Sequence, residues 1–216
     1  MVDHVLLAVR DLDEGTSRLE REYGLLALDG GRHPGRGTAN RLVPLGSQYL
    51  ELIAVVDPEE AARTRLGQRV ATAVSEGRTL VDWALRTEDM EALRARLLRE
   101  GWNPPAGWEG SRERPNGEVL RWQSQELEPT AGPTAIPFVI EWQVPEGQHP
   151  GEMEARHPGG ARRLSKVVVG ARDPAATRVK LTELLGHSDL YTVVQAERDG
   201  LREVVIDGER GTLTIR

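Results

Sequence analysis

The sequence lacks cysteine, long apolar runs and an excess of positive charge. Without cysteine the chain can form no disulfide, no thiolate zinc site and no cysteine nucleophile. No apolar run approaches the roughly 20 residues that cross a membrane, and the first residues do not have the pattern of a secretory signal. The 34 acidic residues outnumber the 28 basic ones and give a net charge of −6. A general nucleic-acid binder is therefore excluded, and the sequence predicts a cytoplasmic protein.

Three segments of the chain, 3–24, 80–101 and 165–186, share one pattern. Each opens with an apolar run typical of a strand and continues with a polar residue suited to begin a helix. Apolar residues at helical spacing follow, and each segment ends in glycine, which readily takes the left-handed conformation that ends a helix. Strand-like material follows each helix. The sequence thus predicts a strand–helix–strand–strand–strand unit, written βαβββ, that occurs three times.

The repeats set the predicted boundaries of the units. The units are expected at residues 1–56, 79–144 and 164–216, with helices near 12–23, 88–100 and 174–185. The connector 57–78 is predicted to hold an amphipathic helix near 58–76, because Leu66, Val70 and Val74 lie four residues apart. Residues 145–163 are rich in proline, glycine and charge without periodicity, which indicates a linker.

The repeated unit, with HV in its first strand and LEL in its last, resembles the vicinal oxygen chelate superfamily. Within it, the segment GGRHPGRGTANRLVPLGSQYLELIAV (30–55) and PFVIEW (137–142) are similar to the glyoxalase-like domain family. The resemblance covers roughly residues 3–150. It implies an α+β fold in which repeated βαβββ units form a curved, cup-shaped mixed sheet with helices on its outer face. The first and last strands of a unit are then neighbours, and two units enclose a cavity.

The resemblance also implies metal ligands on those first and last strands. His4, Glu51 and Glu141 match three ligand positions, whereas the fourth falls on Leu80, which binds no metal. Asp82 lies two residues further, on the same face of its strand, and is the candidate substitute as well as a predicted substrate-binding residue.

The third unit has Lys166 and Thr214 where the first has His4 and Glu51, so it is expected to hold no ligand pair. Its sheet is expected to pack against another unit or against a second subunit, which would make the chain a homodimer.

A set of one imidazole and two carboxylates suits an open divalent site for Mn, Ni, Zn, Fe or Mg. It is one histidine short of the ligands of non-haem iron oxygenases, which argues against a dioxygenase. The plain alternative is that both glutamates point to solvent from half-exposed strands. Their matching positions in two repeats favour a shared cavity, because carboxylates gathered in a pocket are functional candidates.

The loop 33–40 offers His33, Arg36 and Asn40 as substrate-binding residues. Its plain interpretation is a turn, because proline followed by glycine favours a type II turn. In the functional interpretation the loop forms the rim of the cavity, and Arg36 binds a substrate carboxylate or phosphate through its planar guanidinium. Trp122 is predicted to line the cavity, and most of the other tryptophans are predicted to lie in the core.

Two functions from different classes remain open on the sequence. The first is a lyase or isomerase of the glyoxalase type, in which a divalent metal polarises a small carbonyl or vicinal-oxygen compound and Glu141 acts as the base. The second is a metal-free binding protein like the drug-sequestering members of the superfamily, which Leu80 favours. In either case the partner is a small molecule.

Overall fold

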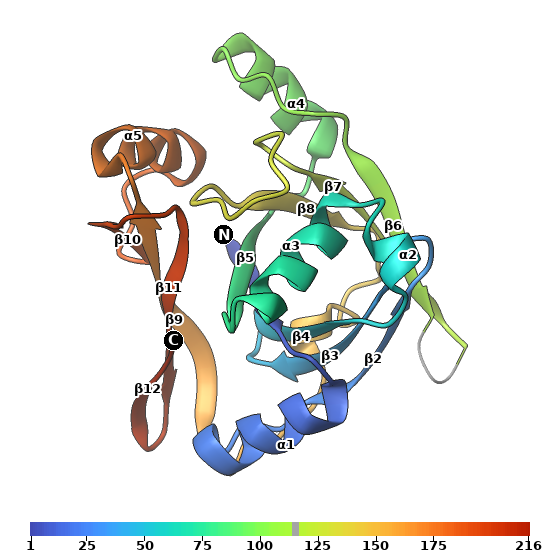
Figure 1. Ribbon diagram of the computed structural model, residues 1–216. Coiled ribbons are helices and arrows are strands. Elements are labelled where there is room, and N and C mark those ends of the chain that lie inside the picture. Colours follow the sequence, from blue (N-terminus) through green and yellow to red (C-terminus); the bar gives the residue numbers. More distant parts are fainter. Residues whose placement is uncertain (114–116) are drawn as a thin grey trace.

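The computed structural model describes residues 1–113 and 117–216, which form two β-sheets and the helices around them (Figure 1). The larger sheet has eight strands, in the spatial order β2 (Leu28–His33), β3 (Thr38–Pro44), β4 (Tyr49–Val55), β1 (Val2–Ala8), β5 (Leu80–Arg86), β8 (Phe138–Trp142), β7 (Val119–Gln125) and β6 (Trp108–Glu113). The smaller sheet has four strands, in the order β10 (Tyr191–Gln195), β9 (Ala161–Ala171), β11 (Gly200–Gly208) and β12 (Gly211–Ile215).

Pairing between the first and last strand of each unit builds the larger sheet. β1 lies parallel to β4, and β5 lies parallel to β8. The antiparallel pair β1–β5 joins the two units. The sheet curves so far that its two end strands, β2 and β6, contact each other. The predicted fold class, an α+β fold built on a curved mixed sheet, is confirmed.

The outer face of this sheet packs against α1 (Leu12–Tyr23) and α4 (Met90–Arg99), whose buried leucines share one core with β1 and β5. The local sequence fixes the ends of α1. The Asp11 carboxylate accepts hydrogen bonds from the first free backbone N–H groups, and Gly24 ends the helix with a φ of 62°.

The connector between the units holds two helices where one was predicted. They are α2 (Pro58–Ala61) and α3 (Arg65–Ser75). Thr64 separates them, because its hydroxyl accepts a hydrogen bond from the Gly67 N–H and begins a new helix. α3 packs on the inner face of the larger sheet through a core of Val70 and Ala73 against β1 and β4. α3 therefore lies within the curve of the sheet, as Figure 1 shows.

The region 164–216 has the predicted order of elements but a different pairing. β9 is followed by α5 (Pro174–Leu185), and β10 then pairs in parallel with β9. In the first two units the last strand takes that place, whereas here β12 lies at the sheet edge beside β11. Lys166 and Thr214 pair with Val205 from opposite sides, so they do not correspond to a ligand pair on adjacent strands.

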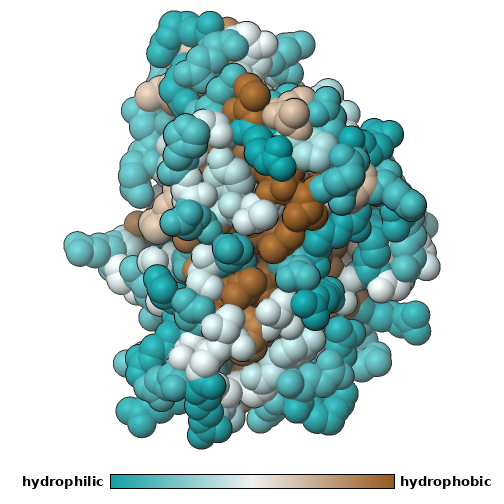
Figure 2. Space-filling model, turned by 90° about the vertical axis from the view of Figure 1, so that its left-hand side faces the viewer, coloured by the Kyte–Doolittle hydropathy of each residue, from teal (hydrophilic) through white to brown (hydrophobic). Residues whose placement is uncertain are grey.

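The smaller sheet packs against the first two units of the same chain. β11 lies against β5, and Val204 and Ile206 of β11 share one core with Trp83 and Leu85 of β5. Seen from the side of the smaller sheet (Figure 2), hydrophobic residues form only a narrow band between hydrophilic ones. The apolar side chains of this region are thus directed mainly into the common core.

The segment predicted as a linker is fixed to the first unit by two buried histidines. His157 Nδ1 accepts a hydrogen bond from the Leu26 N–H, and its Nε2 lies 2.7 Å from the carbonyl oxygen of Pro44. His149 begins a single 3₁₀ turn at Pro150–Glu152 and reaches β1. None of the helices in the described part of the chain is long and apolar enough to cross a membrane.

Candidate active site

A cavity lies inside the curve of the larger sheet, between the first two units. Its polar wall comes from the first unit and includes His4, His33, Asn40, Tyr49 and Glu51. Its apolar wall comes from the second unit and includes Trp108, Trp122, Phe138, Ile140 and Trp142. The centre of a water molecule can occupy about 40 Å³ of the cavity, and the whole empty space including the mouth is about 510 Å³. The cavity is therefore a narrow slot with one polar and one aromatic wall.

Glu51 is a buried carboxylate on the polar wall. Strand alternation in β4 turns Tyr49 and Glu51 towards the cavity, while Leu50 and Leu52 join the core under the helices. The Asn40 amide donates a hydrogen bond of 2.8 Å to Glu51 Oε1. Only 6% of Glu51 is exposed, so this carboxylate has exchanged water for fixed polar neighbours.

His4 lies beside Glu51 on the adjacent strand β1. Its Nε2 is 3.4 Å from Glu51 Oε2, and its Nδ1 is 2.7 Å from Asp3 Oδ2. The ring stacks on Tyr49 with centroids 4.5 Å apart. Because an ionised Asp3 accepts a proton donor, Nδ1 carries the proton and Nε2 faces Glu51. Both residues predicted from the first unit therefore meet in the cavity.

Asp3 orients His4 and was not predicted. Its carboxylate accepts hydrogen bonds from His4, from His149 at 3.0 Å and from the Trp142 indole at 3.2 Å. Burial alone would raise the pKa of Asp3, but the hydrogen bonds from His149 and His4 outweigh it and hold that pKa well below its usual range. The β1–β5 register shifts between Val2 and His4, so simple alternation does not apply here.

His33 and Asn40, which were predicted as substrate-binding residues of the loop 33–40, lie at the end of β2 and in β3 and complete the polar wall. Asn40 Oδ1 accepts hydrogen bonds from Arg112 and from the Gly31 N–H, so its amide nitrogen points to Glu51 and lies 3.1 Å from His33 Nε2. That nitrogen of His33 is then the acceptor, and Nδ1 donates to the Thr38 hydroxyl at 2.9 Å. Burial lowers the pKa of His33, with Glu51 opposing, which agrees with a neutral ring.

Arg112 was missed by the sequence analysis, although its setting has a signal there. It reaches Asn40 from β6, across the ends of the curved sheet. A Cβ at Gly30 would lie 2.7 Å from Arg112 Nη1, and one at Gly31 would lie 2.7 Å from Arg112 Cγ. Only glycines allow this approach, so the GG pair of the family motif marks the crossing.

Arg36 lies at the rim of the cavity, as predicted, and the turn interpretation of its loop also holds. The Arg36 N–H donates to the His33 carbonyl at 3.1 Å, and Gly35 has a φ of 69°. The guanidinium lies 3.7 Å from the centre of the Trp108 ring. Its partial burial lowers the pKa of Arg36. Trp122, predicted to line the cavity, packs between Trp108 and Trp142.

The prediction that Glu141 joins His4 and Glu51 is wrong. Phe138, Ile140 and Trp142 of β8 line the cavity, so Glu141 lies on the opposite face of that strand. Its carboxylate accepts a 2.7 Å hydrogen bond from the Met90 N–H, at the start of α4. The free N–H groups and positive end of a helix stabilise a carboxylate at this position.

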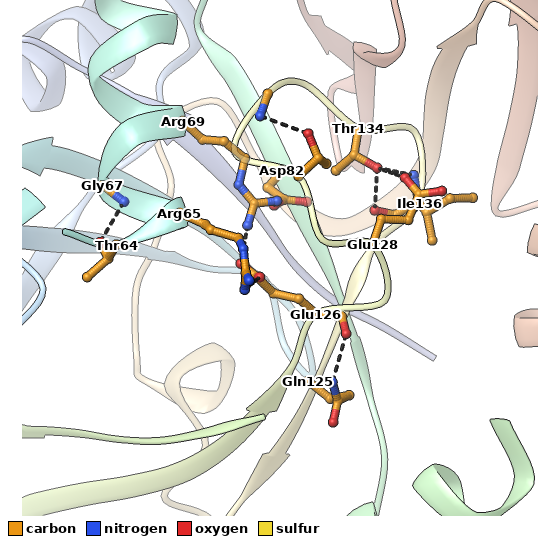
Figure 3. A network of polar contacts seen from close by, with 12 residues as sticks. Thr64, Arg65, Gly67, Arg69, Asp82, Gln125, Glu126, Glu128, Thr134 and Ile136 are labelled. Carbon is orange, nitrogen blue, oxygen red and sulfur yellow. Dashed lines mark hydrogen bonds and ion pairs between the residues drawn. The ribbon is translucent and has the colours of Figure 1, made fainter. Parts of the chain in front are cut away.

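Asp82 is buried but does not line the cavity, which corrects its assignment as a ligand or substrate residue. It is 2.7 Å from Arg69 of α3, and Arg69 also pairs with Glu126, which pairs with Arg65 (Figure 3). Burial raises the pKa of Asp82 to about 6, with Arg69 opposing. This ion-pair network holds α3 against the sheet, beside the cavity residue Leu66.

The predicted metal-ligand set does not fit this site. Glu141 lies outside the cavity, and the second unit presents carbon and indole side chains where the family places donors. Within residues 1–113 and 117–216, no group of three or more histidine, aspartate or glutamate side chains is arranged to hold a metal ion.

Comparison with known proteins places the chain in a family. A model of the glyoxalase-like domain matches residues 2–185, which extends beyond the expected 3–150 into β9 and α5. A crystal structure of a hypothetical protein from Staphylococcus aureus is similar with a TM-score of 0.79 and 17% identity, over 100% of this chain and 98% of that one. The comparison with curated proteins gave no match.

Two methylmalonyl-CoA epimerases are also similar over part of the chain. The enzyme from Mycobacterium tuberculosis has a TM-score of 0.47 and 20% identity, over 67% of this chain and 89% of that one. The Streptomyces coelicolor enzyme has a TM-score of 0.48 and 16% identity, over 66% and 97%. With its family model matched from residue 2 to residue 185, the chain belongs to the glyoxalase-like domain family.

Proposed function

We propose that the chain is an enzyme that moves a proton on a small carbonyl or vicinal-oxygen compound, as a lyase or isomerase of the glyoxalase type. One observation carries the proposal: the buried Glu51 carboxylate lines the cavity beside His4, whose ring is oriented by Asp3. A base needs a fixed position and little water around it, and Glu51 has both. The role that the sequence analysis gave to Glu141 passes to Glu51.

In the proposed reaction Glu51 takes the proton from the carbon next to a substrate carbonyl. The electron pair of that C–H bond moves onto the carbonyl oxygen, which becomes an enolate. With a proton also on Nε2, His4 would donate a hydrogen bond to the enolate oxygen, and the Asp3 carboxylate behind it would balance the charge of the ring. Glu51 then returns the proton to the substrate. The proposed steps use no metal. Of the three predicted metal ligands, His4 and Glu51 line the cavity and Glu141 does not.

The remaining cavity residues bind and orient the substrate. Asn40 fixes the base through its hydrogen bond to Glu51 Oε1, and neutral His33 supports Asn40. Trp122 and its neighbours pack against the apolar part of the substrate. Arg36 binds an anionic group at the mouth.

The alternative is a metal-free binding protein, which the aromatic wall favours. Trp108, Trp122 and Trp142 form a continuous surface on which flat compounds stack without any reaction. Such a protein binds its ligand equally well whether or not Glu51 can accept a proton.

Proton exchange in D₂O separates the two functions. We expect the wild-type protein to exchange the α-protons of at least one compound in a panel of small 2-oxo acids and α-hydroxy ketones. The exchange is measured as the loss of the α-proton NMR signals. Glu51→Gln is expected to lower that rate by about 100-fold or more, since general bases contribute on this scale. Glu141→Gln is the matched control and is expected to keep the rate, and a chelator is expected to leave it unchanged. If the wild-type protein binds these compounds but exchanges their protons no faster than Glu51→Gln, the chain is a binding protein instead.

A further inference from the structure

One hydroxyl in the cavity has no partner. Ser124 of β7 lines the aromatic wall and is 1% exposed. Its Oγ is buried and forms no hydrogen bond with any group in the described part of the chain. Buried hydroxyls are almost always paired, because losing water without a replacement destabilises the folded state. A hydroxyl that stays unpaired at the surface of a cavity points to a ligand atom as its partner.

A cation lies close to this hydroxyl. Ser124 is directly opposite Trp108 in the β6–β7 pair, so the two side chains are neighbours on the same face. The Arg36 guanidinium lies over the ring of Trp108, 3.7 Å from its centre. Among the described residues no carboxylate is within ion-pairing distance of Arg36. The cavity therefore presents a buried hydroxyl without a partner and a cation without a carboxylate partner, both beside the Trp108 ring.

We propose that Ser124 and Arg36 form a carboxylate subsite, and that the ligand is a small planar organic monocarboxylate. The proposal deepens the proposed function and rests on it for the reaction, but not for the binding. The Ser124 hydroxyl donates to one carboxylate oxygen, and Arg36 binds the charge. The flat part of the ligand lies in the slot between the polar wall and the tryptophans.

Charge and shape select this ligand class. Glu51 lies inside the cavity and the negative charge of Glu126 acts on Arg36, so a doubly charged phosphate would be repelled more strongly than a monoanion. The slot is narrow, and aromatic rings bind flat groups best by stacking. A bulky, non-planar acid of equal charge does not fit the same space.

Quenching of intrinsic tryptophan fluorescence tests the subsite without any assay of activity. All five tryptophans lie between residues 83 and 142, and three of them line the cavity. Benzoate is the probe, benzamide is its neutral counterpart of the same shape, and cyclohexanecarboxylate is its non-planar counterpart. We expect benzoate to bind wild type at least tenfold more tightly than either of the other two.

Two variants assign the binding to the subsite. Ser124→Ala is expected to weaken benzoate binding about tenfold and benzamide binding less, because a hydrogen bond to a charged oxygen is stronger than one to a neutral carbonyl. Arg36→Gln is expected to remove the preference for benzoate over benzamide. The matched control is Ser165→Ala, since Ser165 lies in β9, outside the cavity, and its hydroxyl donates to the Asp207 carboxylate of β11 at 3.0 Å.

The proposal is overturned if benzamide binds as tightly as benzoate, if Ser124→Ala binds benzoate like wild type, or if benzoate does not bind. Binding by Glu51→Gln separates the subsite from the reaction. If this variant binds benzoate as tightly as wild type or more tightly while proton exchange is absent from all proteins, the subsite stands and the catalytic proposal fails.

Discussion

At the scale of single residues, the face on which a side chain lies decides its chemistry. Glu51 and Glu141 occupy similar apolar strands, yet one lines the cavity and the other begins a helix. Asp3 and His4 are adjacent in sequence and form a hydrogen-bonded pair at a point where the β1–β5 register shifts. Sequence patterns identify the residue types, but small shifts of strand register select which of them meet.

Asp3→Asn is expected to lower the free energy of unfolding by about 2 kcal/mol at pH 7, because charge-assisted hydrogen bonds from His4 and His149 are lost. The pKa of Asp3 is lower in the folded protein than its usual 3.8, so its ionised form contributes stability above about pH 4. That contribution decreases as the pH falls below about 4, because Asp3 takes up a proton in the unfolded chain there while it stays ionised in the folded protein. Urea unfolding of both proteins between pH 7 and pH 3 measures the gap, which is the difference in free energy of unfolding between wild type and variant. This gap should shrink in acid.

The surface variant Asp207→Asn is the control for this experiment. Asp207 also has a lowered pKa, chiefly from its hydrogen bond with Ser165, but it is exposed to water. Its gap should be much smaller at every pH. A gap for Asp3→Asn that is constant from pH 7 to pH 3 would contradict the assigned role of its charge.

At the scale of elements, capping groups explain where helices begin, including one cap that comes from a distant strand. Asp89 accepts a hydrogen bond from the Ala92 N–H, and Glu141 accepts one from the Met90 N–H. α4 thus has a local and a non-local cap. The same logic separates α2 from α3, because Thr64 begins the second helix.

Glu141→Ala is expected to lower the free energy of unfolding by about 1–2 kcal/mol, since the helix loses both a hydrogen bond and a favourable charge. Glu141→Gln keeps an acceptor and should cost less, about 0.5 kcal/mol. Thermal and urea unfolding measure both values. Benzoate binding should be unchanged in either variant, and a loss of binding without loss of stability would return Glu141 to the site.

The sequence predicted the elements better than their pairing. Helices 12–23 and 174–185 agree with α1 and α5, because an aspartate before and a glycine after each helix are local signals. The position of β10 beside β9 has no such signal, since strand order depends on contacts between distant segments. For the site, the family motif located His4, His33 and Asn40. It did not locate Ser124, whose unpaired hydroxyl is visible only once the cavity is formed.

At the scale of the whole molecule, one hydrophobic core joins all three units. It runs from the leucines of α1 and α4 through β1 and β5 to β9 and β11. His149 and His157 fix the intervening segment to the first unit. A region that differs in strand pairing is thus integrated with the sheet that forms the site, and the molecule should unfold as one cooperative unit.

Ile206→Ala tests this integration at a distance from the cavity. Ile206 of β11 is fully buried in the common core, so its truncation should lower the free energy of unfolding by about 2–5 kcal/mol. Every tryptophan lies between residues 83 and 142, so tryptophan fluorescence reports on the second unit, whereas circular dichroism reports on the whole chain. Both signals should shift together to the same lower midpoint. Val194→Ala, at a position 37% exposed, should change the free energy of unfolding by less than about 0.5 kcal/mol and leave both midpoints nearly unchanged. An early transition in circular dichroism with an unchanged tryptophan transition would show instead that residues 164–216 unfold separately.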